Sequence, residues 1–366
     1  MGKSVLRMMT KLRVLFILHL PPPLHGASFV GSMIRDSREV DDAFEARFVN
    51  LSASDRLDEV GRFSVRKFMP VFRLIREVRR TVAEWKPDLV YLTPSCTMPG
   101  LLKDAFVARA ARDSKVVLHF HNKGIAERQG WFVNDFLYRM LFKDARVILL
   151  SKLLYPDIRK YVPEERVAYC PNGIYVPSVE RIPGACPRIL FLSNIIRSKG
   201  VSVLIDACRI LKERGVGFQC FLVGAPSGDY PGDSLAAGIR EKGLTDFIEY
   251  KGPAYGDAKW EAFAKADVFV HPTLNDSFPL VILEAMGAGL PVVTTAEGAI
   301  PEMVRDGEDG MVCPKNGPVA LADALQNLLS DSEMRTRMGE SGKARYRELY
   351  TQEMFLKRFV DVLKDA

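Results

Sequence analysis

The sequence has no apolar run long enough to cross a membrane. Its first apolar stretch, 12–18, contains Arg13 and is followed within a few residues by three prolines rather than by a cleavage site. A membrane-spanning helix needs about 18 or more apolar residues, and a secretory signal ends at small residues. We therefore expect a cytoplasmic protein, with peripheral association at the inner face of the membrane as the alternative.

Cysteine pairs and the common cofactor motifs are also missing. The six cysteines are scattered without a CxxC pair, so neither a zinc site nor a disulfide framework is indicated. No GxGxxG follows the first strand, which argues against a nicotinamide or flavin. The net charge of +6 is mild, and aromatic residues do not alternate with basic ones as in a nucleic-acid-binding patch. We expect free thiols, no metal, no cofactor and no nucleic-acid partner.

What the sequence does contain is a regular alternation of short apolar strands with helical patterns such as 99–112 and 132–143. This order is typical of βαβ units with parallel sheets. The predicted strands are 12–18, 46–51, 88–93, 115–121, 146–151 and 166–173, then 188–194, 218–224, 247–252, 267–272, 291–295 and 310–314.

The pattern is interrupted once, at 172–187, where prolines and glycines predict a linker. A length of 366 residues suits two α/β domains. We expect an N-terminal domain over 1–180, a second domain over 181–350, and a final helix at 351–366 that returns to the first domain. In doubly wound sheets of this kind, ligands bind beyond the carboxyl ends of the strands.

Two such loops in the first domain are candidates. In HLPPPLHGASFVG, prolines stiffen the loop, and Gly26 with Ala27 lets the backbone approach a ligand; a purely structural loop is the alternative. In HFHNKG, His119 and His121 share one side of a strand. His121 at the strand end is the candidate ligand contact, and His119 is the expected core residue.

The loop SNIIRSKG opens a predicted helix at Val201 in the second domain. Arg197 and Lys199 near that helix N-terminus, with the backbone N–H groups and the helix dipole, form a candidate anion site. Exposed arginine and lysine side chains that only interact with solvent are the alternative.

The stretch NDSFPLVILEAMGAGLP places Asp276 and Glu284 around the start of another helix, predicted at Leu280. The backbone N–H groups near Ser277 and Phe278 face outward at such a start. Glu284 lies one turn further on and is aimed back toward the N-terminus, where a carboxylate can accept hydrogen bonds from a ligand. An internal salt bridge of Glu284 is the alternative.

This stretch resembles the nucleotide-sugar-binding region of family 4 glycosyltransferases, which are retaining enzymes of the GT-B fold. That family has an acid, seven residues and then a glutamate, and Asp276 and Glu284 keep this spacing. SNIIRSKG, FLVGAPSG, YKGPAY, KADVFVHPT and GAIPEMVRDGEDGMV follow the family's order through the second domain, while HFHNKG and CPNGI match more loosely in the first. The resemblance implies two Rossmann-like, doubly wound parallel-sheet domains that face each other across a cleft.

The resemblance also implies roles for individual residues. The implied catalytic residues are His121, Arg197, Lys199 and Asp276. The implied donor-binding residues are Gly26, Ala27, Asn194, Tyr255, Ser277, Phe278, Pro279, Leu280, Val281 and Glu284. Three positions depart from the family: Asp276 is shorter than the usual glutamate, Asn194 stands where an arginine is common, and Pro279 replaces a common glycine and removes one N–H donor.

The implied reaction moves a sugar, with retention, from a nucleoside-diphosphate sugar to a glycan or lipid-linked acceptor, as in surface polysaccharide synthesis. A UDP-sugar is the first expectation and a GDP-sugar the second. We expect front-face attack in which the departing β-phosphate takes the acceptor's proton, with cations stabilising the diphosphate and no metal required. A catalytically silent nucleotide-sugar-binding protein and a GT-B epimerase or hydrolase stay open as alternatives.

The segment 62–85 has seven basic residues up to Arg80 against one acid, Glu77. An apolar stripe through Phe68, Phe72, Ile75 and Val82 predicts an amphipathic helix on the first sheet with a solvated basic face. The sharper interpretation is that this basic face meets an anionic membrane that holds the acceptor.

Overall fold

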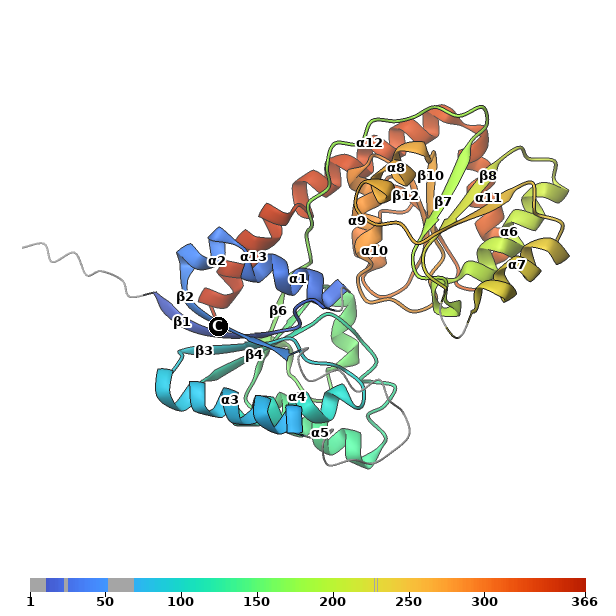
Figure 1. The fold of residues 1–366 in the computed structure, drawn as a ribbon. Helices are drawn as coiled ribbons and strands as arrows, with labels where there is room; N and C mark the ends of the chain where they lie inside the picture. Colours follow the sequence, from blue (N-terminus) through green and yellow to red (C-terminus); the bar gives the residue numbers. More distant parts are fainter. Residues whose placement is uncertain (1–10, 23–25, 52–68, 227, 229) are drawn as a thin grey trace, which may run out of the picture. The chain divides into compact units, whose positions relative to one another are not determined.

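The computed structural model describes residues 11–22, 26–51, 69–226, 228 and 230–366 (Figure 1). The chain forms two compact units, unit 1 (Met1–Pro171 and Leu356–Ala366) and unit 2 (Asn172–Phe355). The sequence predicts that the first domain ends at residue 180 and that 351–366 returns to it, whereas the units divide after residues 171 and 355. In the described part of the chain, no helix is long and apolar enough to cross a membrane.

Unit 1 is built on a six-stranded sheet with the order β2-β1-β3-β4-β5-β6, in which every pair is parallel. Residues 14–18 of the second strand in that order are fully buried, which explains why the sequence shows a continuous apolar run instead of an alternation. The strands are β1 (Leu12–Leu18), β2 (Phe44–Asn50), β3 (Leu89–Leu92), β4 (Lys115–Phe120), β5 (Arg146–Leu149) and β6 (Val167–Tyr169).

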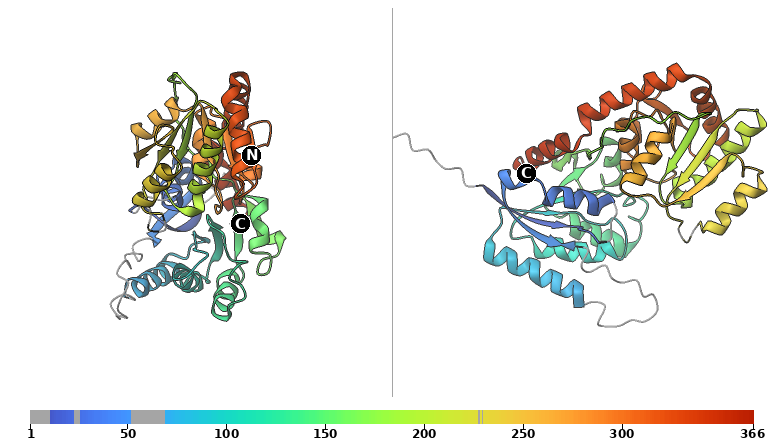
Figure 2. Two further views of the ribbon diagram at one scale, coloured as in Figure 1. Left: turned by 90° about the vertical axis from the view of Figure 1, so that its right-hand side faces the viewer. Right: turned by 45° about the horizontal axis from the view of Figure 1, so that its top comes forward.

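Helices cover both faces of this sheet, as Figure 1 and Figure 2 show. One face carries α1 (Gly26–Arg35), α2 (Arg38–Ala43) and the unit 1 part of α13 (Gln352–Lys364); the other carries α3 (Met69–Trp85), α4 (Gly100–Ala110) and α5 (Phe132–Phe142). Phe359 of α13 packs edge-on against Tyr91 of β3, with ring centroids 5.2 Å apart. The described part of unit 1 also contains the 3-10 turns η3 (Lys152–Asp157) and η4 (Glu164–Arg166).

Helix α3 packs on the sheet as predicted, but its buried face is rotated relative to the predicted stripe. Its buried residues are Leu74, Val78, Val82 and Trp85. These four positions fall on one side of a 3.6-residue helix, and Phe72 lies on the opposite side, where it is 62% exposed. Of the predicted stripe, Val82 is buried and Ile75 half-buried, while the placement of Phe72 is wrong and Phe68 lies outside the described residues. The exposed arginines of the helix are Arg73, Arg76, Arg79 and Arg80.

Unit 2 repeats the architecture with a parallel sheet in the order β12-β11-β10-β7-β8-β9. Its strands are β7 (Arg188–Leu192), β8 (Gln219–Val223), β9 (Ile248–Gly252), β10 (Val268–His271), β11 (Val292–Thr295) and β12 (Gly310–Cys313). Its helices are α6 (Val201–Glu213), α7 (Gly232–Glu241), α8 (Asp257–Lys265), α9 (Leu280–Gly287), α10 (Ile300–Met303), α11 (Pro318–Ser330) and α12 (Ser332–Leu349). The chain order reverses between β7 and β10.

The start of the predicted linker is fixed to unit 2. Ile174 N–H donates to the carbonyl of Tyr350, and Gln352 N–H donates to the carbonyl of Ile174, at 2.9 and 3.0 Å. The N–H of Val176 donates to the hydroxyl of Tyr346 at 3.1 Å. These bonds explain why the unit boundary falls at residue 171, before the segment that the prolines and glycines marked.

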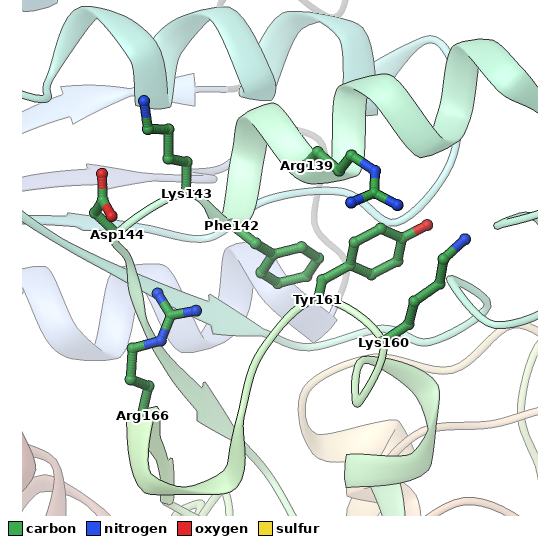
Figure 3. Close-up of a pocket in the computed structure, with 7 residues that line it drawn as sticks. All are labelled: Arg139, Phe142, Lys143, Asp144, Lys160, Tyr161 and Arg166. Atoms are coloured by element: carbon green, nitrogen blue, oxygen red, sulfur yellow. The ribbon is translucent and has the colours of Figure 1, made fainter.

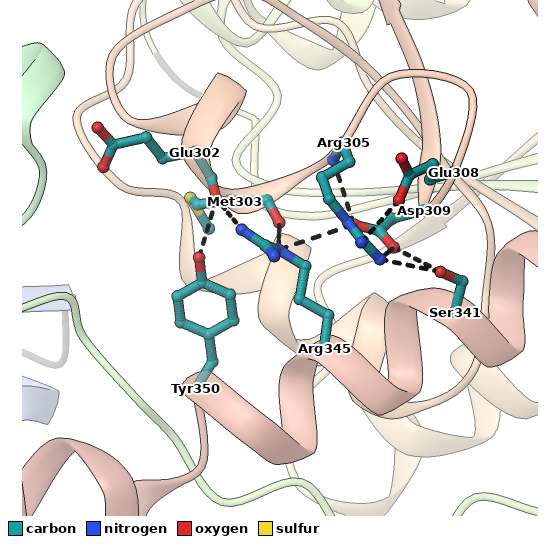
Figure 4. A network of polar contacts seen from close by, with 8 residues as sticks. All are labelled: Glu302, Met303, Arg305, Glu308, Asp309, Ser341, Arg345 and Tyr350. Atoms are coloured by element: carbon teal, nitrogen blue, oxygen red, sulfur yellow. Dashed lines mark hydrogen bonds and ion pairs between the residues drawn. The ribbon is translucent and has the colours of Figure 1, made fainter.

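A buried carboxylate organises the loop between α10 and β12 (Figure 4). Both oxygens of Asp309 accept from the guanidinium of Arg305, at 2.9 and 2.7 Å, and Ser341 of α12 adds a third bond at 2.8 Å. Arg345 of α12 donates to the carbonyls of Glu302 and Met303, the last two residues of α10 before this loop. Charge-assisted bonds therefore join the loop to α12.

This network predicts different costs for two neighbouring acids that both pair with Arg305. Asp309→Ala should lower the free energy of unfolding of unit 2 by about 2 kcal/mol, because a buried acceptor of charge-assisted bonds is lost. Glu308 is exposed although its oxygen lies 2.6 Å from Arg305. Glu308→Ala should therefore lower the free energy of unfolding by less than about 0.5 kcal/mol. Urea unfolding read from Trp260, with Trp85 and Trp131 of unit 1 replaced by Phe, follows unit 2 alone. Equal costs would contradict the structural role of the buried pair.

Candidate functional site

The two strands at the reversal of unit 2 bring two loops together. Strands β7 and β10 pair directly, so the loops 193–200 and 272–279 leave the same edge of the sheet. The carbonyl of Ser198 accepts from the N–H groups of Leu274 and Asn275, at 2.8 and 3.2 Å. Gly200 has a φ of +76°, and a Cβ there would lie 1.9 Å from the carbonyl oxygen of Pro272, so this close approach requires glycine.

Lys199 and Asp276, two predicted catalytic residues, form an ion pair in this place. The Nζ of Lys199 donates to Oδ2 of Asp276 at 2.6 Å, and Nε2 of His271 lies 3.0 Å from the same oxygen. Burial alone would raise the pKa of Asp276, but the bonds and charges of His271 and Lys199 outweigh burial and lower the pKa to about 2. Asp276 is therefore ionised at neutral pH, and Lys199 is fixed beside the start of α6.

Glu284 is the fifth residue of α9, which begins at Leu280 as predicted. Its Oε1 accepts from Lys259 of α8 at 2.8 Å, so the internal salt bridge considered as an alternative exists. Its Oε2 is buried and has no hydrogen-bond partner in the described part of the chain. Burial raises the pKa of Glu284, although the charge and hydrogen bond of Lys259 oppose the shift. An unpartnered buried carboxylate oxygen is costly, and a ligand hydroxyl would satisfy it.

The backbone before α9 forms a tight turn that places its first N–H groups. Pro279 is the N-cap with a φ of −71°, and its carbonyl accepts from Ile282 N–H at 3.1 Å. The first N–H groups of a helix, here those of Leu280 and Val281, have no partner within it. Gly298 supports the turn from outside, since a Cβ there would lie 2.3 Å from the carbonyl oxygen of Asp276.

The remaining predicted donor-binding residues of unit 2 differ in exposure. The side chain of Phe278 packs against Tyr350, with ring centroids 6.1 Å apart, so only its backbone suits a ligand. Tyr255 is 71% exposed in the loop between β9 and α8. Arg197 lies in the 3-10 turn before α6, with its guanidinium carbon 5.4 Å from the ring centroid of Tyr230. Ser277 is buried in the loop 272–279, and Asn194 is exposed in the loop 193–200.

In unit 1, the candidate residues again follow strand ends. Gly26 and Ala27 are the first residues of α1, where N–H groups lack helical partners; residues 23–25 before them lie outside the described part. His119 is fully buried, and its Nδ1 lies 2.7 Å from the hydroxyl of Tyr91, so its predicted place in the core is confirmed.

His121 directly follows β4, and its ring centroid lies 4.3 Å from that of His119. Neither ring nitrogen of His121 has a hydrogen-bond partner among the described residues. Burial, assisted by the charge of His19, lowers the pKa of His121 to about 3. The ring is therefore neutral near pH 7 and can both donate and accept a hydrogen bond.

Sequence reasoning missed three contributors to the site of unit 2. Lys259 lies on another helix from Glu284, and no local motif links the two. His271 ends a buried strand, where a histidine gives no signal of its own. Gly298 supports the turn before α9 only because the loop that follows β11, to which Gly298 belongs, passes over that turn. Among the described residues, no group of three or more His, Cys, Asp or Glu side chains could hold a metal ion.

The low pKa of Asp276 predicts how the stability of unit 2 varies with pH. A carboxyl whose pKa falls from about 3.9 in the unfolded chain to about 2 stabilises the fold above pH 4, and this contribution disappears as the pH falls from about 4 to 2. Asp276→Asn should thus lower the unfolding free energy by roughly 2 kcal/mol at pH 7 and by much less near pH 2.5. Urea unfolding read from Trp260 measures the unfolding free energy at both pH values. A difference that is independent of pH would refute the ionised pair.

Comparison with known proteins shows similarity over most of unit 2 to one family. Residues 177–345 match the model of the family described as "Glycosyl transferases group 1". Over 190 residues the chain is 33% identical to D-inositol 3-phosphate glycosyltransferase from Paenarthrobacter aurescens (strain TC1), a match covering 48% of this chain and 46% of that protein. The chain thus spans about half the length of this relative.

Solved structures resemble the whole fold. Sucrose-phosphate synthase (tll1590) from Thermosynechococcus elongatus superposes with a TM-score of 0.76 at 18% identity, covering 97% of this chain and 98% of that one. Alr3699/HepE from Anabaena, in complex with UDP-glucose, gives a TM-score of 0.74 at 19% identity, covering 97% and 100%. The expected α/β fold of the GT-B class, with two parallel six-stranded sheets, is confirmed.

Proposed function

We propose that the chain is a retaining glycosyltransferase, because its residues 177–345 match the model of the glycosyl transferases group 1 family. The donor is a nucleoside-diphosphate sugar, first of all a UDP-sugar. The acceptor is a glycan or a lipid-linked glycan, as in surface polysaccharide synthesis. The observation that carries the proposal is the buried, unpartnered Oε2 of Glu284 on the same sheet edge as Arg197 and Lys199.

Glu284 is the proposed contact for the nucleoside. Lys259 holds one carboxylate oxygen, which fixes the side chain and leaves Oε2 for the paired hydroxyls of a ribose. A hydroxyl that donates to this oxygen would remove the cost of leaving a buried acceptor unpaired. The UDP-glucose complex of the structural relative from Anabaena supports a uridine donor.

The diphosphate is the proposed partner of Arg197, Lys199 and the N–H groups at the start of α9. Cations and helix starts favour anions. Because Asp276 keeps Lys199 in one orientation at 2.6 Å, the ammonium group is positioned before a ligand arrives. We propose that these groups stabilise the leaving group without a metal ion.

The proposed reaction is a front-face displacement. The bond between the anomeric carbon and the β-phosphate oxygen breaks, the acceptor oxygen bonds to the same face of that carbon, and its proton passes to the departing phosphate. Negative charge grows on the diphosphate during this step, so fixed cations beside it favour the transition state more than the ground state. His121, neutral at pH 7, is proposed to orient the sugar by a hydrogen bond.

The experiment that tests this function combines binding with transfer. Wild-type protein should be stabilised by UDP more than by GDP, ADP or dTDP in a thermal-shift assay. It should transfer sugar only when an acceptor is present, and the product should keep the anomeric configuration of the donor. Glu284→Ala should weaken UDP binding by roughly 1 to 3 kcal/mol, because a charge-assisted bond is lost, and should abolish transfer. Glu261→Ala, an exposed acid on α8 paired with Lys265, is the matched control.

Other results would point elsewhere. Sugar release without acceptor indicates a hydrolase, conversion of the donor an epimerase, and binding without turnover a silent binding protein. Lys199→Met should weaken UDP far more than uridine, since its proposed partner is the diphosphate. Unchanged UDP affinity in folded Glu284→Ala would remove this residue from the site.

Replacing His121 tests the contribution of unit 1. His121→Ala should lower turnover while leaving UDP affinity nearly intact, because the nucleotide is assigned to unit 2. His119→Ala should instead lower stability, because it removes a buried bond to Tyr91. Steady-state kinetics and UDP titration separate the two effects. Loss of turnover in a folded His119→Ala protein, together with a harmless His121→Ala change, would show that the wrong histidine was assigned.

We also propose that the exposed arginines of α3 attract an anionic membrane that carries the acceptor. Arg73, Arg76 and Arg80 point away from the packed face of the helix. Each basic residue near such a surface contributes about 1 kcal/mol, which gives reversible and salt-sensitive attraction. This helix offers one strongly exposed aromatic side chain, Phe72, so its attraction is mainly electrostatic.

A further inference from the structure

The beginning of α5 exposes a concentration of large apolar side chains. Phe132 is 87% exposed and Trp131 73%, and Val133 and Phe136 are also largely in solvent. The opposite side of the same helix is buried through Leu137, Tyr138, Leu141 and Phe142. Packing of α5 on unit 1 therefore does not use these four residues, and scattered surface residues do not form such a group.

The exposed side of α5 changes from aromatic to basic side chains along its length. Positions 132, 136, 139 and 143 are spaced by four, three and four residues, so they form one stripe. The stripe begins with Phe132 and Phe136 and ends with Arg139 and Lys143. The eleven residues of α5 span roughly 15 Å, so aromatic and basic side chains follow each other within one surface.

The basic end of the stripe borders a hollow of about 700 Å³ (Figure 3). Four cations and one acid line it, together with two aromatic rings: Arg139, Lys143, Lys160, Arg166, Asp144, Phe142 and Tyr161. Figure 3 shows the rings of Phe142 and Tyr161 between the basic side chains. The excess of positive charge makes the hollow suitable for a phosphate group.

One carboxylate holds part of this hollow in place. Asp135 accepts from Arg139 at 2.7 Å, from Lys160 at 2.6 Å and from the hydroxyl of Tyr161 at 2.8 Å. Lys160 also donates to the carbonyl of Gln129, which ties the hollow to the loop before Trp131. The basic and aromatic parts of the surface are thus connected by direct bonds.

We propose that this surface, Trp131–Lys143 with Lys160 and Arg166, docks onto an anionic lipid bilayer. The aromatic residues enter the interfacial region, where tryptophan and phenylalanine are favoured, and the basic hollow receives lipid phosphate groups. Aromatic and basic groups side by side match the acyl and phosphate layers of a bilayer. Helix α3 lies in the same layer (Figure 1) but lacks such an aromatic group. The inference concerns binding and does not depend on the proposed sugar transfer.

Vesicle flotation of the full chain tests this surface. The protein should float with vesicles of phosphatidylglycerol and phosphatidylcholine at low salt and much less with phosphatidylcholine alone. The double change Phe132→Ser with Phe136→Ser should weaken this binding at least about tenfold, since insertion of the rings is lost. Lys143→Gln with Arg166→Gln should mainly reduce the preference for the anionic lipid.

Two controls keep the result specific. Val319→Ser on α11 removes an exposed apolar residue of unit 2 and should leave flotation unchanged. Phe72→Ser with Arg73→Ser and Arg76→Ser tests α3 and should reduce binding less than the α5 aromatic change. Vesicles should also shift the tryptophan emission of the wild-type protein to the blue, and Trp131→Phe should remove that shift.

Three outcomes would overturn the proposal. Flotation that survives the α5 changes but is lost with the α3 changes would make α3 the interface. Absence of flotation with anionic vesicles at low salt would exclude a bilayer. A dimer in sedimentation analysis that Phe132→Ser with Phe136→Ser dissociates would instead assign the surface to a second copy of the chain.

Discussion

The pairing of β10 with β7 is the constraint on which the site of unit 2 depends. The two strands are distant in sequence, yet their parallel pairing sets two loops beside each other, and Ser198 joins them through its carbonyl. Lys199 and Asp276 can form their ion pair only because of this arrangement. A parallel sheet whose order reverses at this point provides both the place for a ligand and the rigid edges that hold the charges.

Opposing demands act on the two acids of this site. Asp276 is surrounded by donors, and its pKa is low, so its charge supports the fold. Glu284 has one oxygen paired and one buried without a partner, so its charge opposes burial and its pKa is raised. A fold selected for stability alone would satisfy both oxygens. The incomplete pairing of Glu284 is the kind of cost that a ligand can offset on binding.

The sequence indicated the elements of the site better than its contacts. Helix starts at Val201 and Leu280 were predicted correctly, because the glycine or proline before each start and the apolar run after it are local signals. Lys259 could not be found, since its contact with Glu284 depends on how α8 packs beside α9. Phe72 of α3 was assigned to the wrong side because this helix carries apolar residues on two sides, and only contact with the sheet decides which side is buried.

Helix α5 of unit 1 also carries large apolar residues on two sides. An amphipathic helix normally buries its aromatic residues, because their large apolar area favours burial. Helix α5 buries Leu137, Tyr138, Leu141 and Phe142 and still leaves Phe132 and Phe136 in solvent. Exposed rings lower solubility and add nothing to the core, so the stability of unit 1 does not account for them. Their position on one stripe with Arg139 and Lys143 is accounted for if the stripe meets a surface that is apolar at one depth and anionic at the next.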